Sequence, residues 1–412
     1  MTGEAPLGPF GLDRSVCATR AVDRTVLVPV HHLTAGTRLA EVVPMLEADR
    51  RIQVVYTQAP TQRFGAGTAE YLRGLGAVVI PWRLAIASRF DLAVAATHGS
   101  LESLHAPVLY LPHGVGFARY QAALRSGEGP AGRRYSGDAS PAAIVKYGRI
   151  VPSAIVVAHE AQLEQLAQGC PEAVPVARVA GDPAYDRLLA SAAHRAEYRA
   201  ALGVRQGRRL VVVSSSHQTS SLLGRHPDLL PRLMAALPAD RYQVAAAVHP
   251  NVWAWHGRRQ VTAWYADCIR AGMRLLPPEH GWHGALVAAD VVLGDCGSVT
   301  YYAAAAGRPV ALAAFPDESG IDPSSQMALL ARIAPRLDSG LPLRPQIDAV
   351  MADYAPLRYA EIRARASSVP GRSAELIRSV MYELMDLPEP ARPAHTEPAP
   401  APVPIVPFPE AA

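Results

Sequence analysis

Short apolar runs alternate with longer amphipathic stretches through most of the chain. In the first half, runs that fit buried strands cover residues 25–30, 51–57, 76–80, 92–96, 108–111 and 154–158. In the second half, they cover residues 209–214, 243–248, 273–276, 291–294 and 309–312. Apolar strands separated by helix-length segments are typical of parallel sheets that are covered on both faces. The pattern therefore predicts two α/β sheets in tandem with a cleft between them.

The same pattern sets the expected domain boundaries. Residues 1–20 should be a loose leader, residues 21–190 an N-terminal domain and residues 191–387 a C-terminal domain. From residue 388 onward the chain has nine prolines and no periodicity. Such a Pro/Ala-rich segment buries too little apolar surface to fold by itself. We therefore expect residues 388–412 to be a disordered tail whose removal leaves the melting temperature unchanged.

Composition narrows the class of protein. Half of the 412 residues are hydrophobic and 18% are charged, which favours sizeable buried cores over disorder. A net charge of +4, without basic runs interleaved with aromatics, argues against a nucleic-acid surface. The four cysteines show no paired spacing, and neither a secretion signal nor a run of about 20 apolar residues is visible. These features predict a cytoplasmic protein.

Two histidines stand where buried strands are expected to end. His113 is followed by Gly114 and Gly116, which would let an acceptor approach closely, and His249 ends a strand in the second half. Ligands of parallel α/β sheets bind beyond the carboxyl ends of the strands, so the two histidines could face one cleft. His113 could act as a general base, and His249 could hold a diphosphate leaving group. The alternative is a histidine that bonds a backbone carbonyl or completes the end of its strand.

The segment after the strand at residues 291–294 reads as a tight turn followed by a helix start. Gly297 would permit the turn, and Ser298 is expected to cap the helix. Free amides and the positive end of the helix dipole would then suit a phosphate. We predict donor and phosphate contacts at Asp295, Gly297, Ser298, Val299 and Thr300. An ordinary capped helix that binds nothing is the alternative.

A segment rich in hydroxyl groups, residues 214–221, leaves the first strand of the second half. Its Ser216 and His217 could line the same donor site, although a flexible polar loop is the alternative. The chain has no Asp-x-Asp pair and no phosphate-loop motif, and its histidines are too scattered for a zinc site. We therefore expect no metal and no cofactor, with a nucleotide-activated donor as a substrate.

Several short motifs, taken in order, resemble one known group of enzymes. They are a His-Gly pair (His113, Gly114), a Gly-x-Pro turn with a following Asp (Gly181, Pro183, Asp186), a His-Pro strand end (His249, Pro250), an Asp-plus-Ser turn (Asp295, Ser298, Val299) and a Gly-Arg-Ser helix start (Gly371, Arg372, Ser373). Together they resemble the CDP-glycerol glycerophosphotransferases of teichoic-acid synthesis, within the GT-B class of two facing Rossmann-like domains. The resemblance spans about residues 90–385.

The resemblance implies roles for four of these residues. His113 would be the base on the acceptor hydroxyl, His249 would contact the donor phosphates, and Asp295 and Ser298 would shape the donor site. The chain also departs from the family pattern. Cys296-Gly297-Ser298 replaces an aromatic residue and two serines, Val115 replaces a threonine, and residues 214–217 replace a Pro-Thr-x-Arg stretch. These departures concern the identity of the donor more than the fold.

The function expected from these features is transfer of a glycerophosphate, or a related group, from a CDP-glycerol-like donor to an acceptor hydroxyl in cell-surface polymer synthesis. A lipid-linked acceptor would bring the protein into peripheral contact with the inner face of the cell membrane. One alternative is a GT-B glycosyltransferase or nucleotide-sugar epimerase with a UDP-linked donor. The other is a non-catalytic relic that binds a nucleotide or a partner protein.

Overall fold

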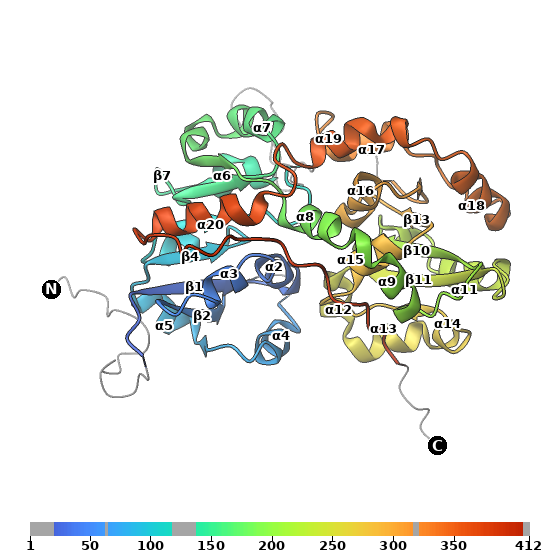
Figure 1. Ribbon diagram of the computed structural model, residues 1–412, viewed down its shortest axis with the longest axis horizontal. Helices are drawn as coiled ribbons and strands as arrows, with labels where there is room; N and C mark the ends of the chain where they lie inside the picture. The colour runs from blue at the N-terminus through green and yellow to red at the C-terminus, as the bar shows by residue number, and fades with distance from the viewer. Residues whose placement is uncertain (1–19, 62–64, 118–136, 316–320, 407–412) are drawn as a thin grey trace, which may run out of the picture. The chain divides into compact units, whose positions relative to one another are not determined.

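The computed structural model describes residues 20–61, 65–117, 137–315 and 321–406 (Figure 1). Residue contacts divide the chain into two compact units. Within the described residues, unit 1 comprises residues 20–61, 65–117, 137–184 and 368–396, and unit 2 comprises residues 185–315, 321–367 and 397–406. The boundary between the two units after residue 184 falls inside helix α8 (Pro183–Ala190), before the domain boundary expected after residue 190. Nearly all of the expected leader, residues 1–19, lies outside the described residues.

Unit 1 contains a seven-stranded sheet with the order β3-β2-β1-β4-β5-β8-β9, in which all paired strands are parallel. The strands are β1 (Arg24–Val30), β2 (Ile52–Gln58), β3 (Val79–Ile80), β4 (Leu92–Ala95), β5 (Val108–Tyr110), β8 (Ala154–Val157) and β9 (Ala177–Val179). The helices are α2 (Leu33–Leu39), α3 (Pro44–Glu47), α4 (Thr68–Gly74), α5 (Trp82–Ala87), α6 (Pro141–Ile144), α7 (Ala161–Gly169) and α20 (Ser373–Leu384). A small antiparallel pair, β6 (Val145–Lys146) and β7 (Arg149–Ile150), lies outside this sheet.

The central strands of the unit 1 sheet are buried on both faces because most of their residues are apolar. Val26 and Val28 of β1 pack in one hydrophobic cluster, whereas Leu27 between them packs in another. Helix α20 contributes Ile377 and Met381 to the first cluster. The chain therefore returns to unit 1 near its end, although we expected residues 191–387 to form one domain.

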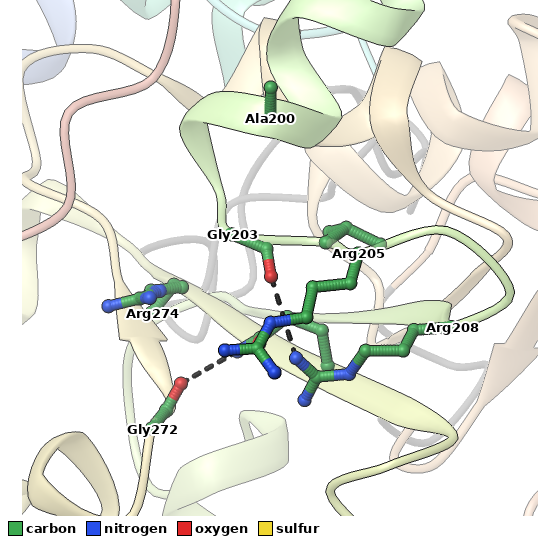
Figure 2. A pocket seen from close by; sticks show the side chains of 8 residues that line it. Ala200, Gly203, Arg205, Arg208, Gly272 and Arg274 are labelled. Carbon is green, nitrogen blue, oxygen red and sulfur yellow. Dashed lines mark hydrogen bonds between the residues drawn. The ribbon is translucent and has the colours of Figure 1, made fainter.

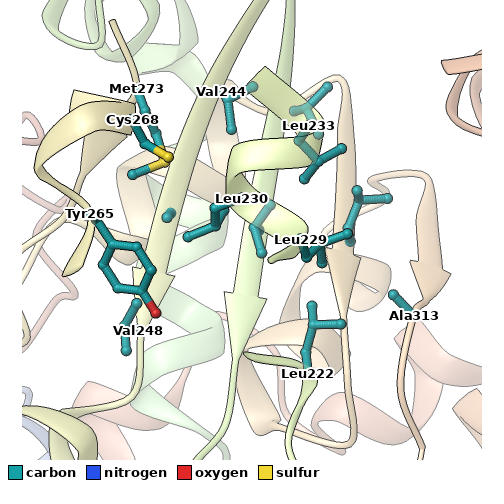
Figure 3. Packing of buried hydrophobic residues seen from close by; sticks show 14 of the residues in the cluster. Leu222, Leu229, Leu230, Leu233, Val244, Val248, Tyr265, Cys268, Met273 and Ala313 are labelled. Carbon is teal, nitrogen blue, oxygen red and sulfur yellow. The ribbon is translucent and has the colours of Figure 1, made fainter. Parts of the chain in front are cut away.

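Unit 2 contains a five-stranded parallel sheet with the order β12-β11-β10-β13-β14. The strands are β10 (Arg209–Ser215), β11 (Tyr242–Val248), β12 (Arg274–Leu275), β13 (Val291–Gly294) and β14 (Val310–Leu312). The helices are α9 (Arg195–Ala201), α10 (Leu222–Arg225), α11 (Leu229–Ala236), α12 (Pro250–His256), α13 (Arg258–Trp264), α14 (Ala266–Arg270), α15 (Trp282–Ala288), α16 (Ser298–Ala305), α17 (Gln326–Ile333), α18 (Leu343–Ala352) and α19 (Ala360–Ala366). Figure 3 shows leucines of α11 packed against the sheet, with Leu230 and Leu233 among the fully buried side chains.

The predicted α/β class with two Rossmann-like parallel sheets is confirmed. Every apolar run that was expected to be a strand contains one, and most ends agree within a residue or two. Strand β9 was not predicted, because its three residues are flanked by proline and contain an arginine. Within the described residues, no helix is long and apolar enough to cross a membrane.

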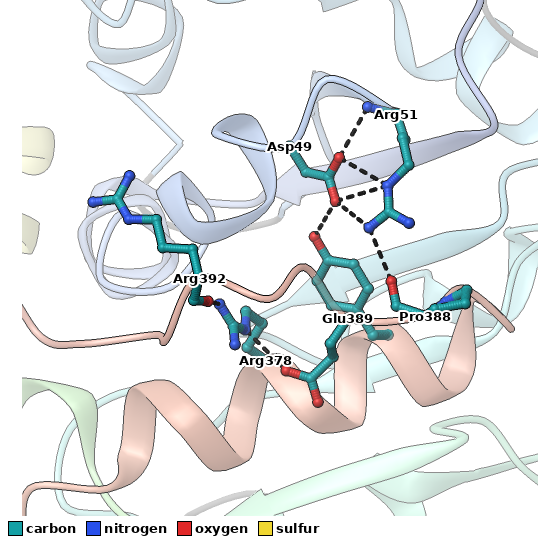
Figure 4. A network of polar contacts seen from close by, with 7 residues as sticks. Asp49, Arg51, Arg378, Pro388, Glu389 and Arg392 are labelled. Carbon is teal, nitrogen blue, oxygen red and sulfur yellow. Dashed lines mark hydrogen bonds and ion pairs between the residues drawn. The ribbon is translucent and has the colours of Figure 1, made fainter.

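The segment that begins at residue 388 is ordered as far as residue 406, contrary to the expectation of a disordered tail. Its first part is bound to unit 1, as Figure 4 shows. Arg51 donates to the carbonyl of Pro388 over 2.9 Å. Arg378 of α20 donates to Glu389 over 3.0 Å and to the carbonyl of Arg392 over 2.7 Å. Proline has no backbone N–H to donate in a sheet, so a proline-rich segment forms few backbone hydrogen bonds. The bonds from these side chains hold the segment in place instead.

The second part of this segment, residues 397–406, is bound to unit 2. The backbone of Ala399 accepts from Tyr198 over 2.5 Å and donates to Ser191 over 2.8 Å. The amide of Ile405 donates to the carbonyl of Leu275 over 2.8 Å, and its side chain packs on the core of the unit. The segment of residues 388–406 is therefore held by groups on the folded units. The sequence of the segment alone does not reveal these groups.

We predict that a chain ending at Leu387 is less stable than the full chain. The deletion removes six hydrogen bonds of about 1 kcal/mol each, together with the apolar burial at Ala399 and Ile405. Thermal unfolding should show a melting temperature lower by several degrees. Equal melting temperatures for the two chains would mean that the segment contributes nothing to stability.

Candidate functional site

The strand order of each sheet reverses at one point, and such points are where parallel α/β sheets bind ligands. In unit 1 the reversal lies between β1 and β4, and in unit 2 it lies between β10 and β13. Beyond the carboxyl ends of these strands, the chain continues through His31, Ala96, Ser216 and Asp295, respectively. The predicted site residues therefore lie at, or one strand away from, these two points.

His113 lies beyond β5, the strand next to β4. Its Nδ1 is 2.9 Å from the carbonyl oxygen of Ala96. Because a carbonyl can only accept, Nδ1 carries the proton of the neutral ring and Nε2 keeps its lone pair. A contact with a backbone carbonyl was the alternative to a catalytic role for His113. The same contact favours the tautomer with the proton on Nδ1, and this tautomer leaves Nε2 able to accept a proton.

A buried ion pair holds the residue before His113. Arg38 of α2 donates to Asp182 over 2.8 Å and to the carbonyl of Pro112 over 3.0 Å. Both charged side chains are less than a tenth exposed, and Asp182 also accepts from the amide of Ala184 over 2.9 Å. Removal of one partner would leave an uncompensated buried charge. The Gly-x-Pro turn of residues 181–183 therefore positions the backbone that carries His113.

The two glycines after His113 differ in surroundings. Gly114 and Gly116 both have positive φ, 74° and 78°, which glycine adopts without strain. A Cβ on Gly116 would collide with the amide nitrogen of Gln162, whose oxygen accepts from the amide of Ala158 over 2.6 Å. Gly116 therefore has to be glycine beside Gln162, and contact of an acceptor with it stays a prediction. Contact of an acceptor with Gly114 stays a prediction as well.

His32, which the sequence analysis did not select, lies close to His113. It caps α2 by accepting from the amide of Ala35 at Nδ1 over 3.2 Å, so its Nε2 carries the proton when the ring is neutral. That Nε2 is 3.3 Å from the hydroxyl of Thr97, and the ring centroid is 5.4 Å from that of His113. His32 thus packs edge-on against the candidate base and limits the positions that its ring can adopt.

Two further histidines, His31 and His98, lie at the same edge, and burial lowers the pKa of both. The pKa of His98 falls to about 4. His31 bonds the carbonyl of Gly99 over 2.5 Å, and the His98 ring lies 3.7 Å from that of Tyr110, centroid to centroid. His31 directly follows the predicted strand of residues 25–30, and His98 lies two residues beyond that of residues 92–96. Inspection of every predicted strand end would have found both.

In unit 2, a carboxylate lies at the reversal point itself. Asp295 is fully buried, and its Oδ2 accepts from the amide and the hydroxyl of Ser216 and from the amide of Leu222, each over 2.8 Å. Its Oδ1 accepts from the amide of Gly297 over 2.9 Å. Both oxygens are therefore occupied, and their negative charge would repel a phosphate. Asp295 acts as a positioning residue that fixes two loops, in place of the predicted phosphate contact.

The N-cap of the helix after Asp295 lies one residue earlier than predicted. Gly297 is the N-cap of α16, and Ser298 is its first helical residue, because the Asp295 side chain closes the turn. The amide of Thr300 donates to the carbonyl of Gly297 over 3.1 Å. Within the described residues, the amides of Ser298 and Val299 have no acceptor. These two amides are the anion-binding groups that the turn offers.

Thr300 contributes to the packing below this turn. Its side chain is fully buried, and a Cβ on Gly294 would collide with its hydroxyl. The predicted contact of Thr300 with a phosphate is therefore replaced by packing of its hydroxyl against β13. Gly294 is required because no larger residue would fit beside Thr300.

His217 and His249 come together beside the loop that Asp295 holds. Their ring centroids are 4.6 Å apart. His249 caps α12 by accepting from the amide of Asn251 at Nδ1 over 3.1 Å, so Nε2 carries the proton of the neutral ring and can donate. The side chain of Asn251 is 3.4 Å from His217 Nε2. His217 and His249, which were each predicted at the donor site, thus lie close together beyond the neighbouring strands β10 and β11.

The chemistry available at each edge follows from these groups. In unit 1, Nε2 of His113 carries a lone pair, and in unit 2, His249, Ser298 and Val299 carry N–H groups. In the described part of the chain, no three His, Cys, Asp or Glu residues are grouped to hold a metal ion. A histidine lone pair can accept a proton, and N–H groups can bind an anion, so each edge has its own possible chemistry.

Comparison with known proteins shows the fold. No family model matches the chain, and no curated protein matches it in sequence. The solved structure of the wall teichoic acid polymerase TagF matches over 89% of this chain and 90% of its own, with 10% identity and a TM-score of 0.60. A TagF variant soaked with CDPG matches over 88% and 89%, with 12% identity and a TM-score of 0.59.

A second kind of structure has a weaker likeness. UDP-GlcNAc 2-epimerase from Neisseria meningitidis, bound to UDP-GlcNAc, matches over 88% of this chain and 100% of its own. The identity is 12% and the TM-score is 0.51. At these identities the likeness concerns architecture alone. The chain has the two Rossmann-like units of the GT-B fold.

Proposed function

We propose that the protein is a transferase that moves a glycerophosphate, or a related group, from a nucleotide-activated donor to an acceptor hydroxyl. The observation that carries the proposal is the 2.9 Å contact between His113 Nδ1 and the carbonyl oxygen of Ala96. The carbonyl of Ala96 holds the proton on Nδ1 and leaves Nε2 as a base at a ligand-binding edge. The likeness to the TagF fold supports a donor of this type.

In the proposed reaction, the acceptor oxygen attacks the donor phosphorus while His113 Nε2 takes the hydroxyl proton. A bond forms between the acceptor oxygen and the phosphorus, and the bond from the phosphorus to the oxygen of the leaving nucleotide phosphate breaks. Negative charge grows on that leaving oxygen. His249 Nε2–H and the amides of Ser298 and Val299 are the proposed donors that stabilise it. Ser216 and His217 line the same edge.

A UDP-linked donor is the second candidate, because the epimerase with the same fold was solved with UDP-GlcNAc. The donor groups of unit 2 recognise phosphates, which both kinds of nucleotide share. The base and the sugar must therefore be distinguished by direct binding measurements. In both cases, the diphosphate would lie against the start of α16.

We predict that His113→Gln lowers kcat about 10²- to 10⁴-fold, which is the usual contribution of a general base. Affinity for the donor should change little, because His113 belongs to unit 1 and the donor groups to unit 2. His105→Gln is the matched control, since His105 is an exposed histidine of the same unit. Steady-state transfer assays with both variants would test the role. Turnover near that of the natural chain in His113→Gln would remove this residue from the mechanism.

We also predict that at least one of CDP, UDP, GDP, ADP and CDP-glycerol stabilises the protein. At a concentration of 100 Kd, a ligand adds about 2.7 kcal/mol, or roughly 5–10 °C in melting temperature for a domain of this size. A preference for cytidine ligands supports the glycerophosphate donor, and a preference for uridine ligands supports a sugar donor. Thermal-shift titration of the folded protein measures both.

Two substitutions at one position localise that ligand. Ser298→Leu should abolish the shift, because a bulky side chain at the first helical residue covers the two amides. Ser298→Ala should keep it, because the amides stay accessible. If no nucleotide stabilises the folded natural chain, the donor assignment fails and a non-catalytic role becomes the better account.

A further inference from the structure

A pocket of about 420 Å³ lies at the amino-terminal edge of the unit 2 sheet. Its lining residues are Ala200, Gly203, Val204, Arg205, Arg208, Gln243, Gly272 and Arg274. Arg208 precedes β10, Gln243 is the second residue of β11, and Arg274 begins β12. The candidate donor groups follow the opposite ends of these strands. Because β10 has seven residues, the two edges are roughly 20 Å apart.

Three arginines converge on this pocket. Figure 2 shows the side chains of Arg205 and Arg208 reaching toward each other, with Arg274 at the start of β12. Within the described part of the chain, none of the three forms an ion pair. Burial lowers the pKa of Arg208, and the positive charges of Arg205 and Arg274 lower it further. The nearby carboxylate of Asp240 acts in the opposite direction without reversing the shift.

Backbone carbonyls hold two of these side chains in place. Arg208 donates to the carbonyl of Tyr242 over 2.7 Å and to that of Gly203 over 3.5 Å, and its buried Nε has no partner. Arg274 donates from Nε to the carbonyl of Leu202 over 3.2 Å. Carbonyls orient a guanidinium but do not neutralise it. The pocket therefore keeps a concentrated positive charge, and some N–H groups of its guanidinium groups can still donate to a ligand.

Gly203 allows this arrangement. Its φ of +71° favours glycine, and a Cβ at this position would lie 2.7 Å from the Arg274 guanidinium. Any larger residue would displace that arginine from the position beside Gly203. The turn between α9 and β10 is thus shaped around the charged groups.

We infer that this pocket is a binding site for a small phosphorylated anion, separate from the proposed donor site. Planar guanidinium groups match phosphate oxygens with paired hydrogen bonds, and a multivalent anion would offset the mutual repulsion of the three arginines. The volume exceeds that of a single bound water more than tenfold, so a diphosphate fits. Free pyrophosphate and the phosphates of a nucleotide share this chemistry.

Pyrophosphate, at constant ionic strength set with chloride, is the probe, and calorimetric titration of the full chain is the measurement. We expect Arg205→Gln to weaken its binding about tenfold or more, since one charge-assisted contact is lost. Arg205 is exposed and has no partner that folding requires. Arg259→Gln is the matched control, because Arg259 is an exposed arginine elsewhere in the same unit and should leave the affinity unchanged.

The Ser298→Leu chain separates this inference from the donor proposal. Pyrophosphate binding that persists in Ser298→Leu and is lost in Arg205→Gln supports the arginine pocket. In the same chain, tighter binding of CDP or UDP than of pyrophosphate would identify a nucleotide as the source of the phosphates. Binding that is lost in Ser298→Leu and unchanged in Arg205→Gln would place the anion at the donor site and overturn the inference. The absence of pyrophosphate binding to the natural chain would overturn it as well.

Discussion

The buried carboxylate of Asp295 holds together the part of unit 2 on which the functional account depends. Its two oxygens accept four hydrogen bonds, which come from Ser216, Leu222 and Gly297. Bonds to a charged acceptor contribute about 1.5–3 kcal/mol each, and loss of the acceptor would leave buried amides unsatisfied. This single group therefore fixes both loops at the strand reversal. It also leaves the amides of Ser298 and Val299 as the groups that can bind an anion.

In unit 1, buried charged side chains also hold the backbone at a strand end, but the neighbouring group is a histidine instead of two backbone amides. The buried pair of Arg38 and Asp182 fixes the carbonyl of Pro112, and the carbonyl of Ala96 fixes the tautomer of His113. Burial lowers the pKa of the neighbouring His31 and His98, which disfavours their charged forms. In each unit, a buried charged side chain holds the backbone at a strand end: Arg38 with Asp182 in unit 1, and Asp295 in unit 2. The candidate functional groups, His113 in unit 1 and the amides of Ser298 and Val299 in unit 2, lie next to that backbone.

The strands could be predicted from the sequence because a parallel strand covered on both faces has to be apolar along its whole length. The strand ends then indicated His113, His249 and the loop at Ser216. The support from Arg38 could not be predicted, because Asp182 lies 144 positions away in the chain. The segment of residues 388–406 was mispredicted for a similar reason. Its hydrogen bonds go to Arg51, Ser191, Tyr198 and other groups on distant elements, and no local pattern records them.

Hydrogen–deuterium exchange of the backbone amides, with and without a saturating nucleotide diphosphate, tests the central claim most directly. The account predicts slower exchange at residues 298–299 and in the loop of residues 217–221, because the bound phosphates take the free amides and restrain the loop. The turn at residues 203–208 should stay unchanged at a concentration that fills only the donor site. Saturated binding without protection at residues 298–299 would contradict the account.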